Sequence, residues 1–104
     1  MERVHSRAEV IERLRAHEAE LRALGIASIG LFGSFASDRA TATSDVDLLI
    51  ELLPDRHPFE TFMNAADRLE QLLGRKVELV TRSSLSPYMG PRIMQEVQDV
   101  LRAA

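Results

Sequence analysis

Two carboxylates one residue apart, Asp45 and Asp47, stand at the start of an apolar run over residues 46–53. Side chains two residues apart on a strand point to the same face, so both carboxylates can reach one ion. Like charges held side by side repel, and this costs stability unless a positive partner offsets it. Hard cations such as Mg²⁺ prefer carboxylate oxygens and are often completed by substrate phosphates. The pair therefore predicts a divalent metal site that serves phosphate chemistry.

Glu78 is the third candidate ligand. It interrupts an apolar segment between Val77 and Leu79, and strand pairing could place it beside the two aspartates. Three carboxylates could then hold two metal ions about 3.5–4 Å apart, one activating an acceptor oxygen and one binding nucleotide phosphates. Asp45, Asp47 and Glu78 are the predicted catalytic and metal-binding residues.

Gly33 and Ser34 form the other half of the predicted site, and ten residues separate Ser34 from Asp45. A glycine at the end of a strand lets the backbone approach a ligand closely, and a serine at a helix start offers its hydroxyl and unpaired N–H groups to an anion. These two residues are therefore the predicted nucleotide-binding residues. Taken alone, Gly-Ser is more often an ordinary turn with a helix N-cap, and Asp45 alone could cap the loop.

Periodic segments surround these residues and must position them. A helical pattern follows a Ser-x-x-Glu capping box at Ser6 and ends near Gly25, and a second runs from Pro58 to Gly74. The expected elements are helix 6–25, strand 26–32, a helical turn within 34–39, strand 46–53, helix 58–73, strand 76–81 and helix 91–101. This order, α-β-α-β-α-β-α, predicts an α/β (α+β) fold with helices packed against a small mixed β-sheet. The continuous aliphatic run over 46–53 predicts the central strand.

Length and composition exclude several classes of protein. The 104 residues are expected to form one domain, residues 1–104, with a single modest core. No apolar run approaches the roughly 20 residues that span a bilayer, and the first residues lack a signal-peptide pattern. We therefore expect a cytoplasmic protein with no membrane contact, and the absence of cysteine agrees with a reducing compartment. The net charge of −3 disfavours long nucleic acids as partners and leaves small anionic ligands open.

A purely structural role for the carboxylates is the main alternative. Asp47 or Glu78 could form a salt bridge with Arg39, Arg75 or Lys76. A phosphatase or glycosyltransferase with an Asp-x-Asp motif fits poorly, because the long aliphatic run follows Asp47 and the chain has no room for a sugar-nucleotide fold.

The spaced motif Gly33-Ser34, ten residues, then Asp45-Val46-Asp47 resembles the Gly-Ser-x10-Asp-x-Asp signature of the DNA polymerase β-like nucleotidyltransferase superfamily. The preceding helix, the GLFGSFA strand and turn, the GRKVELVT strand and a C-terminal helix also fall where that family has them. The similarity covers nearly the whole chain, which resembles a minimal nucleotidyltransferase (MNT) domain.

This resemblance implies Mg²⁺-dependent transfer of a nucleoside monophosphate, AMP from ATP, with release of pyrophosphate. By this carry-over Gly33 and Ser34 would hold the triphosphate of the nucleoside triphosphate. Asp45 and Asp47 would bind two Mg²⁺ ions, and Glu78 would stand where the family has its third carboxylate. Domains this small are typically antitoxins of HEPN/MNT toxin–antitoxin modules, and some attach AMP to a tyrosine of the HEPN ribonuclease. A HEPN-domain partner is therefore expected, and a homo-oligomer is compatible with the resemblance.

Two features depart from the family pattern. Ser37 and Asp38 follow Ala36 where members commonly have Arg-Gly, so Arg39 is the nearest arginine, and Glu78 replaces a frequent Asp. The alternative function is accordingly an MNT-like subunit with weak or lost catalysis that neutralises a HEPN ribonuclease by binding.

Overall fold

One mixed four-stranded sheet organises the computed structural model, which describes residues 1–103. β1 (Ile26–Phe32) and β2 (Val46–Leu52) pair antiparallel in its centre. β3 (Val77–Thr81) runs parallel to β2 at one edge, and β4 (Gln98–Leu101) pairs antiparallel with β1 at the other. The predicted mixed sheet is thus confirmed, with the aliphatic run after Asp45 as an interior strand. The predicted domain ends at Ala104, which lies outside the described residues.

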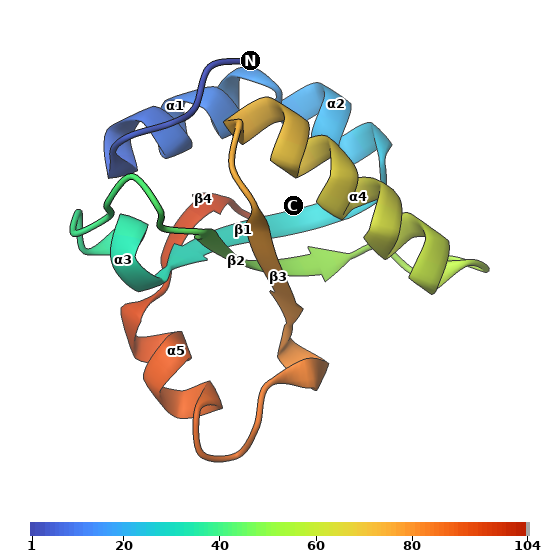
Figure 1. Cartoon of the computed structure of the whole chain (residues 1–104). Helices are drawn as coiled ribbons and strands as arrows, with labels where there is room; N and C mark the ends of the chain where they lie inside the picture. Colours follow the sequence, from blue (N-terminus) through green and yellow to red (C-terminus); the bar gives the residue numbers. More distant parts are fainter. Residues whose placement is uncertain (104) are drawn as a thin grey trace.

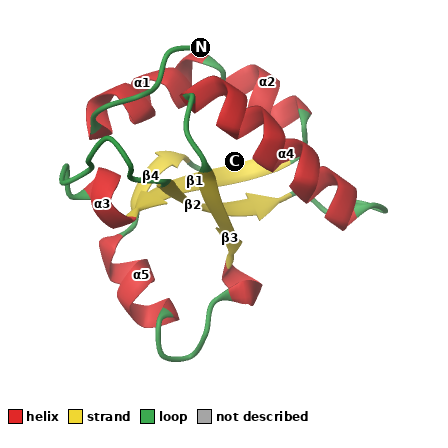
Figure 2. Ribbon diagram, in the orientation of Figure 1, coloured by secondary structure: helices red, strands yellow, loops and turns green. Residues whose placement is uncertain are grey.

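The helices divide between the two faces of this sheet (Figures 1 and 2). Three helices cover one face, a single-turn helix follows β1, and a 3-10 helix leads through a loop to the last helix below the sheet. In chain order they are α1 (Arg7–Ala16), α2 (Glu18–Ala23), α3 (Gly33–Ala36), α4 (Pro58–Leu73), η1 (Arg82–Ser84) and α5 (Gly90–Glu96). Within residues 1–103, every helix is too short or too polar to cross a membrane. We call the sheet face opposite α1, α2 and α4 the open face.

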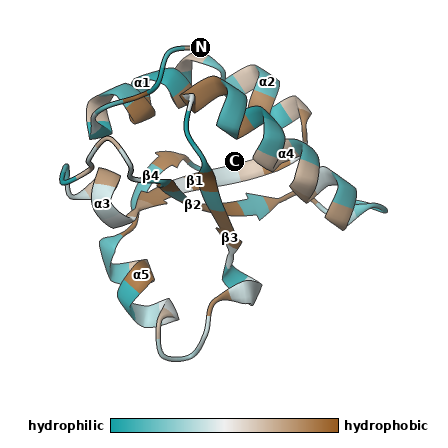
Figure 3. Cartoon of the chain, in the orientation of Figure 1, coloured by the Kyte–Doolittle hydropathy of each residue, from teal (hydrophilic) through white to brown (hydrophobic). Residues whose placement is uncertain are grey.

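The hydrophobic core lies between the sheet and its three covering helices. Val46, Leu48 and Ile50 alternate along β2 and are completely buried, together with Leu69 of α4. Hydropathy follows this arrangement, since the strands are largely hydrophobic and the outward turns of the helices largely hydrophilic (Figure 3). Because strand side chains alternate, the residues between these core positions face the other way. Asp47 is therefore placed on the open face.

The helix ends follow the predicted signals, with one exception. Ser6 caps α1 by accepting a hydrogen bond from the backbone N–H of Glu9, and Gly74 ends α4 with φ +64°. The predicted helix 6–25 is instead two helices, because it breaks at His17. A ring nitrogen of His17 lies 2.9 Å from the carbonyl oxygen of Arg13, the acceptor that a continuous helix would offer to the His17 backbone N–H.

The predicted C-terminal helix over residues 91–101 is wrong in its second half. α5 ends at Glu96, and Gln98–Leu101 forms strand β4. The apolar spacing over these residues fits a helix, but the edge of β1 offers unpaired backbone groups that a strand satisfies. Pairing of Gly30 with Asp99 and of Leu31 with Gln98 completes the sheet on that side.

Candidate functional site

The predicted carboxylates meet at one end of the sheet. Asp47 and Glu78 are direct neighbours in the parallel pairing of β2 with β3. Asp45 stands immediately before β2 and is exposed, as is Glu78, whereas Asp47 is half-buried. The negative charges of both Glu78 and Asp45 act on the Asp47 carboxyl. The structure therefore pairs Asp47 with Glu78 and leaves Asp45 two residues from Asp47, just before the start of the same strand.

This proximity changes the acid–base behaviour of Asp47. Its pKa is raised from 3.8 to about 6, chiefly because burial disfavours the charged form. The charge of Glu78, a hydrogen bond shared with Glu78 and the charge of Asp45 raise the pKa of Asp47 further. The fold thus keeps the carboxyl groups of Asp47 and Glu78 close together although their negative charges repel. A bound cation would relieve this repulsion.

The salt-bridge alternative is not what the structure shows. Among the ion pairs formed within residues 1–103, none joins Asp45, Asp47 or Glu78 to a basic side chain. Arg75 is directed elsewhere, toward backbone carbonyl groups. The carboxylates are consequently available to a ligand.

Arg75 holds the loop that connects the two halves of the site. Its side chain is 7% exposed and donates to the carbonyl oxygens of Val4 (2.7 Å), Thr41 (3.0 Å) and Ser44 (2.9 Å). Its guanidinium also lies over the ring of Phe35, 5.0 Å from the centroid. One buried cation therefore ties α3, the N-terminal segment and the residue before Asp45 to one another.

Replacing Arg75 by lysine is expected to lower the free energy of unfolding by about 3 kcal/mol, since an ammonium group cannot serve these separated acceptors at once. Chemical denaturation measures this loss. Arg56→Lys, at an exposed position, is the matched control and should change stability by less than about 0.5 kcal/mol. Equal stability of Arg75→Lys and the unmodified protein would show that Arg75 does not hold the loop.

Gly33 brings the predicted phosphate-binding turn into contact with Asp47, one of the predicted metal-binding carboxylates. It has φ +73°, a conformation that glycine adopts without strain, and it begins α3 directly after β1. A Cβ atom at Gly33 would overlap the Oδ2 atom of Asp47. The carboxylate of Asp47 thus occupies the space that the missing side chain leaves, so that the predicted nucleotide-binding and metal-binding residues form one site.

A basic cavity of about 590 Å³ opens beside this turn. Gly33, Arg7, Arg39 and Arg92 are among the residues that line it. Arg39 thus faces the same space as the glycine turn although it is shifted from the family's arginine position. Arg7 was missed by the sequence reasoning. The sequence feature that could have identified Arg7 is its position in the first turn of α1, where the helix dipole disfavours positive charge.

Asp38 does not oppose an anion at this turn as strongly as its charge suggests. It adopts φ +58°, and its carboxylate accepts a hydrogen bond from the backbone N–H of Arg7 at 3.1 Å. The negative charge is thereby drawn to the N-terminus of α1, where the helix dipole favours it. The Ser37-Asp38 departure is accommodated within the fold.

The donor set fits Mg²⁺. Within residues 1–103, no three or more His, Cys, Asp or Glu side chains are already arranged around one ion position. Mg²⁺ does not require such a cage, because it is usually bound by one or two carboxylates and completed by water and substrate phosphates. Asp47 and Glu78 supply carboxylate oxygens side by side, and Gly33 leaves the space in which Asp47 meets the phosphate-binding turn.

Comparisons with known proteins agree with this geometry. The profile of the nucleotidyltransferase domain family matches residues 11–100. The protein adenylyltransferase MntA of Thermococcus cleftensis is 37% identical over 90 residues, which span 86% of this chain and 90% of the relative. A solved structure assigned as a minimal nucleotidyltransferase has a TM-score of 0.68 and 27% identity, covering 85% of this chain and 93% of the other.

A more distant solved structure contains a partner. It is a tri-AMPylated HEPN toxin of Shewanella oneidensis in complex with its MNT antitoxin, with a TM-score of 0.60 and 18% identity. The match covers 89% of this chain and 73% of the other. At this level of identity the likeness shows a common fold.

Proposed function

Because the chain belongs to the nucleotidyltransferase domain family, we propose that residues 1–104 form one minimal nucleotidyltransferase domain that transfers AMP from ATP to a protein. The observation that carries this proposal is the position of Asp47, which lies between the glycine of the phosphate-binding turn and the neighbouring carboxylate of Glu78. A phosphate bound at the turn would lie beside two carboxylate ligands for its cation.

Each residue of the site has a distinct part in this chemistry. Gly33 and Ser34 bind the triphosphate through backbone N–H groups and the serine hydroxyl. Asp45, Asp47 and Glu78 would hold two Mg²⁺ ions, which would supply neutralisation of the phosphate charge and a lower pKa for the attacking hydroxyl. The basic cavity beside Gly33 gives the leaving pyrophosphate a region of positive charge.

The transfer forms one bond and breaks one. The acceptor hydroxyl oxygen bonds to the α-phosphorus of ATP, and the bond from that phosphorus to the departing pyrophosphate breaks. The hydroxyl proton passes to a carboxylate. Glu78 is best suited to accept it, because its side chain is exposed on the edge strand β3, where an acceptor can approach, whereas Asp47 is half-buried.

The acceptor is a HEPN toxin, and the chain acts as the antitoxin of the pair. Two findings support this assignment: the relative named MntA is a protein adenylyltransferase, and the fold recurs in an MNT antitoxin bound to an AMPylated HEPN toxin. The position of Asp38 and the placement of Arg39 beside the turn favour catalysis over neutralisation by binding alone.

The test mixes the protein with its HEPN partner, Mg²⁺ and α-labelled ATP. The partner should become labelled, labelling should stop when EDTA is added, and pyrophosphate should be released in equal amount. If the partner is neutralised without label, and the Asp45→Asn, Asp47→Asn double variant protects equally well, the chain is a binding antitoxin and the enzymatic proposal is wrong.

A further inference from the structure

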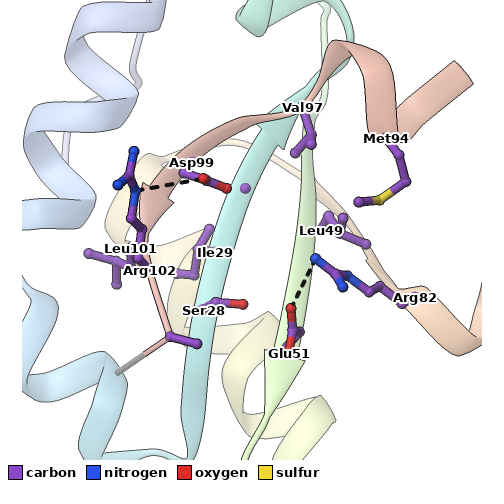
Figure 4. Close-up of a pocket in the computed structure, with 12 residues that line it drawn as sticks. Ser28, Ile29, Leu49, Glu51, Arg82, Met94, Val97, Asp99, Leu101 and Arg102 are labelled. Atoms are coloured by element: carbon purple, nitrogen blue, oxygen red, sulfur yellow. Dashed lines mark ion pairs between the residues drawn. The ribbon is translucent and has the colours of Figure 1, made fainter. Parts of the chain in front are cut away.

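A second cavity lies on the open face of the sheet, and the proposed function does not use it. Its volume is about 280 Å³. Leu49 of β2 and Gly30 of β1 line it from the sheet, and Met94 and Val97 from the α5 side (Figure 4). This volume is near the lower limit of cavities that bind small organic molecules, and the apolar surfaces on both sides suit a flat ring.

The cavity depends on Gly30. A Cβ atom at this position would overlap the Cγ2 atom of Val97, so the absence of a side chain lets the segment after α5 approach the sheet closely. Leu49 and Val97 both line the resulting space (Figure 4). A bulky residue at Gly30 would push α5 away and open the cavity to solvent.

The cavity is in line with the proposed metal site. Asp47, Leu49 and Glu51 alternate along β2 and therefore share the open face. Glu51 is four residue steps along the strand from Asp47, a span of about 13 Å. This is comparable with the length of an extended nucleoside monophosphate, so an α-phosphate held near Asp47 leaves its base beside Glu51.

The polar lining of the cavity contains two pairs of acidic and basic side chains. Glu51 forms an ion pair with Arg82 at 3.4 Å, and both side chains are partly exposed, at 41% and 62%. Such a pair contributes little to stability and can open to a ligand at small cost. A second pair joins Asp99 of β4 to Arg102, just after that strand, at 3.7 Å. β4 is two strands from the strand of Asp47, so this pair is less well aligned with the metal site.

We propose that this cavity binds the adenine base of the nucleotide, with Glu51 accepting a hydrogen bond from the exocyclic amino group and Arg82 donating to the ring nitrogen next to it. Guanine presents the reverse pattern, a carbonyl acceptor and an N–H donor, and would leave both protein groups mismatched. Leu49 and Val97 enclose the ring. The inference rests on the proposed function, because it places the α-phosphate at Asp47.

The test compares MgATP, MgGTP and magnesium tripolyphosphate by calorimetric titration. The unmodified protein should bind ATP more tightly than GTP. Glu51→Gln should reduce this preference by about tenfold or more, because the new amide group can also donate to the carbonyl of guanine. It should leave tripolyphosphate affinity unchanged, because Glu51 contacts only the base. Arg82→Gln, at an exposed position outside the core, should act in the same direction. Glu60→Gln, an exposed carboxylate on α4, is the matched control and should keep the preference.

The outcomes separate this inference from the proposed function. An unchanged ATP to GTP preference in both Glu51→Gln and Arg82→Gln overturns the assignment of the base. So does an equal loss of tripolyphosphate affinity, which would mean that Glu51 supports the phosphate site. Tripolyphosphate binding that is lost in an Asp47 variant would still support the metal and phosphate site, even where one of these two results rules out the base site.

Discussion

Replacing Gly33 by alanine is expected to reduce adenylyl transfer by more than about 100-fold, because the new Cβ atom displaces the Asp47 carboxylate and a shift of about 1 Å in a reacting group can cost that much. The substitution also places a side chain at φ +73°, which costs about 1–3 kcal/mol of stability. Transfer rates with a HEPN acceptor and the midpoint of thermal unfolding measure the two effects separately.

Gly25→Ala is the matched control for this substitution. Gly25 also has positive φ, at +103°, but a Cβ atom there would meet Thr61 of α4 and not Asp47. Gly25 precedes β1, whereas Gly33 follows the other end of that strand. Gly25→Ala should lose a similar amount of stability and retain its specific activity below the melting temperature. If the two variants lose activity in parallel with stability, the contact between Gly33 and Asp47 has no catalytic importance.

Asp47→Asn is expected to lower activity and raise stability, whereas Gly33→Ala lowers both. Transfer should fall by about 1000-fold, because a metal ligand supplies several kcal/mol of transition-state stabilisation and about 1.4 kcal/mol is worth tenfold. The metal-free variant should nevertheless be more stable at pH 7, by about 1 kcal/mol after allowance for solvent screening, since it removes a carboxylate held beside Glu78. Asp67→Asn, an exposed position on α4, should change neither quantity.

The pH dependence of stability gives an independent reading of the same group. The folded pKa of Asp47, about 6, lies above the ordinary value of 3.8, so the folded state binds the proton more tightly. The resulting stabilisation is complete below about pH 4 and disappears as pH rises through 6. The difference in unfolding free energy between Asp47→Asn and the unmodified protein should therefore grow over this range in EDTA. A constant difference between pH 4 and 7 would contradict the raised pKa.

Much of the site could be predicted from sequence because its spacing has few structural solutions. Asp45 and Asp47 begin an aliphatic run that can only be an interior strand, and Gly33 ends the strand before it. The alternation around Glu78 predicted a strand, and the parallel pairing of β3 with β2 then made Glu78 the neighbour of Asp47. These inferences depend on the alternation of side chains along a strand, which is a local property and is the same in the sequence and in the folded structure.

Other features depend on contacts between distant segments and leave little local signal. The strand at Gln98–Leu101 has apolar spacing that also suits a helix, and the exposed edge of β1 decides between them. The sequence suggests Arg75 only as a possible ion-pair partner of the carboxylates, yet its side chain is buried and donates to backbone carbonyl groups of two other segments. Neither the open-face cavity nor the convergence of Arg7, Arg39 and Arg92 can be read from spacing, because each joins residues from several elements.

Calorimetric titration with a non-hydrolysable ATP analogue, in Mg²⁺ and in EDTA, decides whether the carboxylates bind the cation of the nucleotide. Mg²⁺ should raise the affinity of the unmodified protein by about 100-fold or more, and this gain should disappear in Asp47→Asn. Equal affinity with and without Mg²⁺, or a gain of the same size in Asp47→Asn, would show that these carboxylates do not bind the nucleotide's cation.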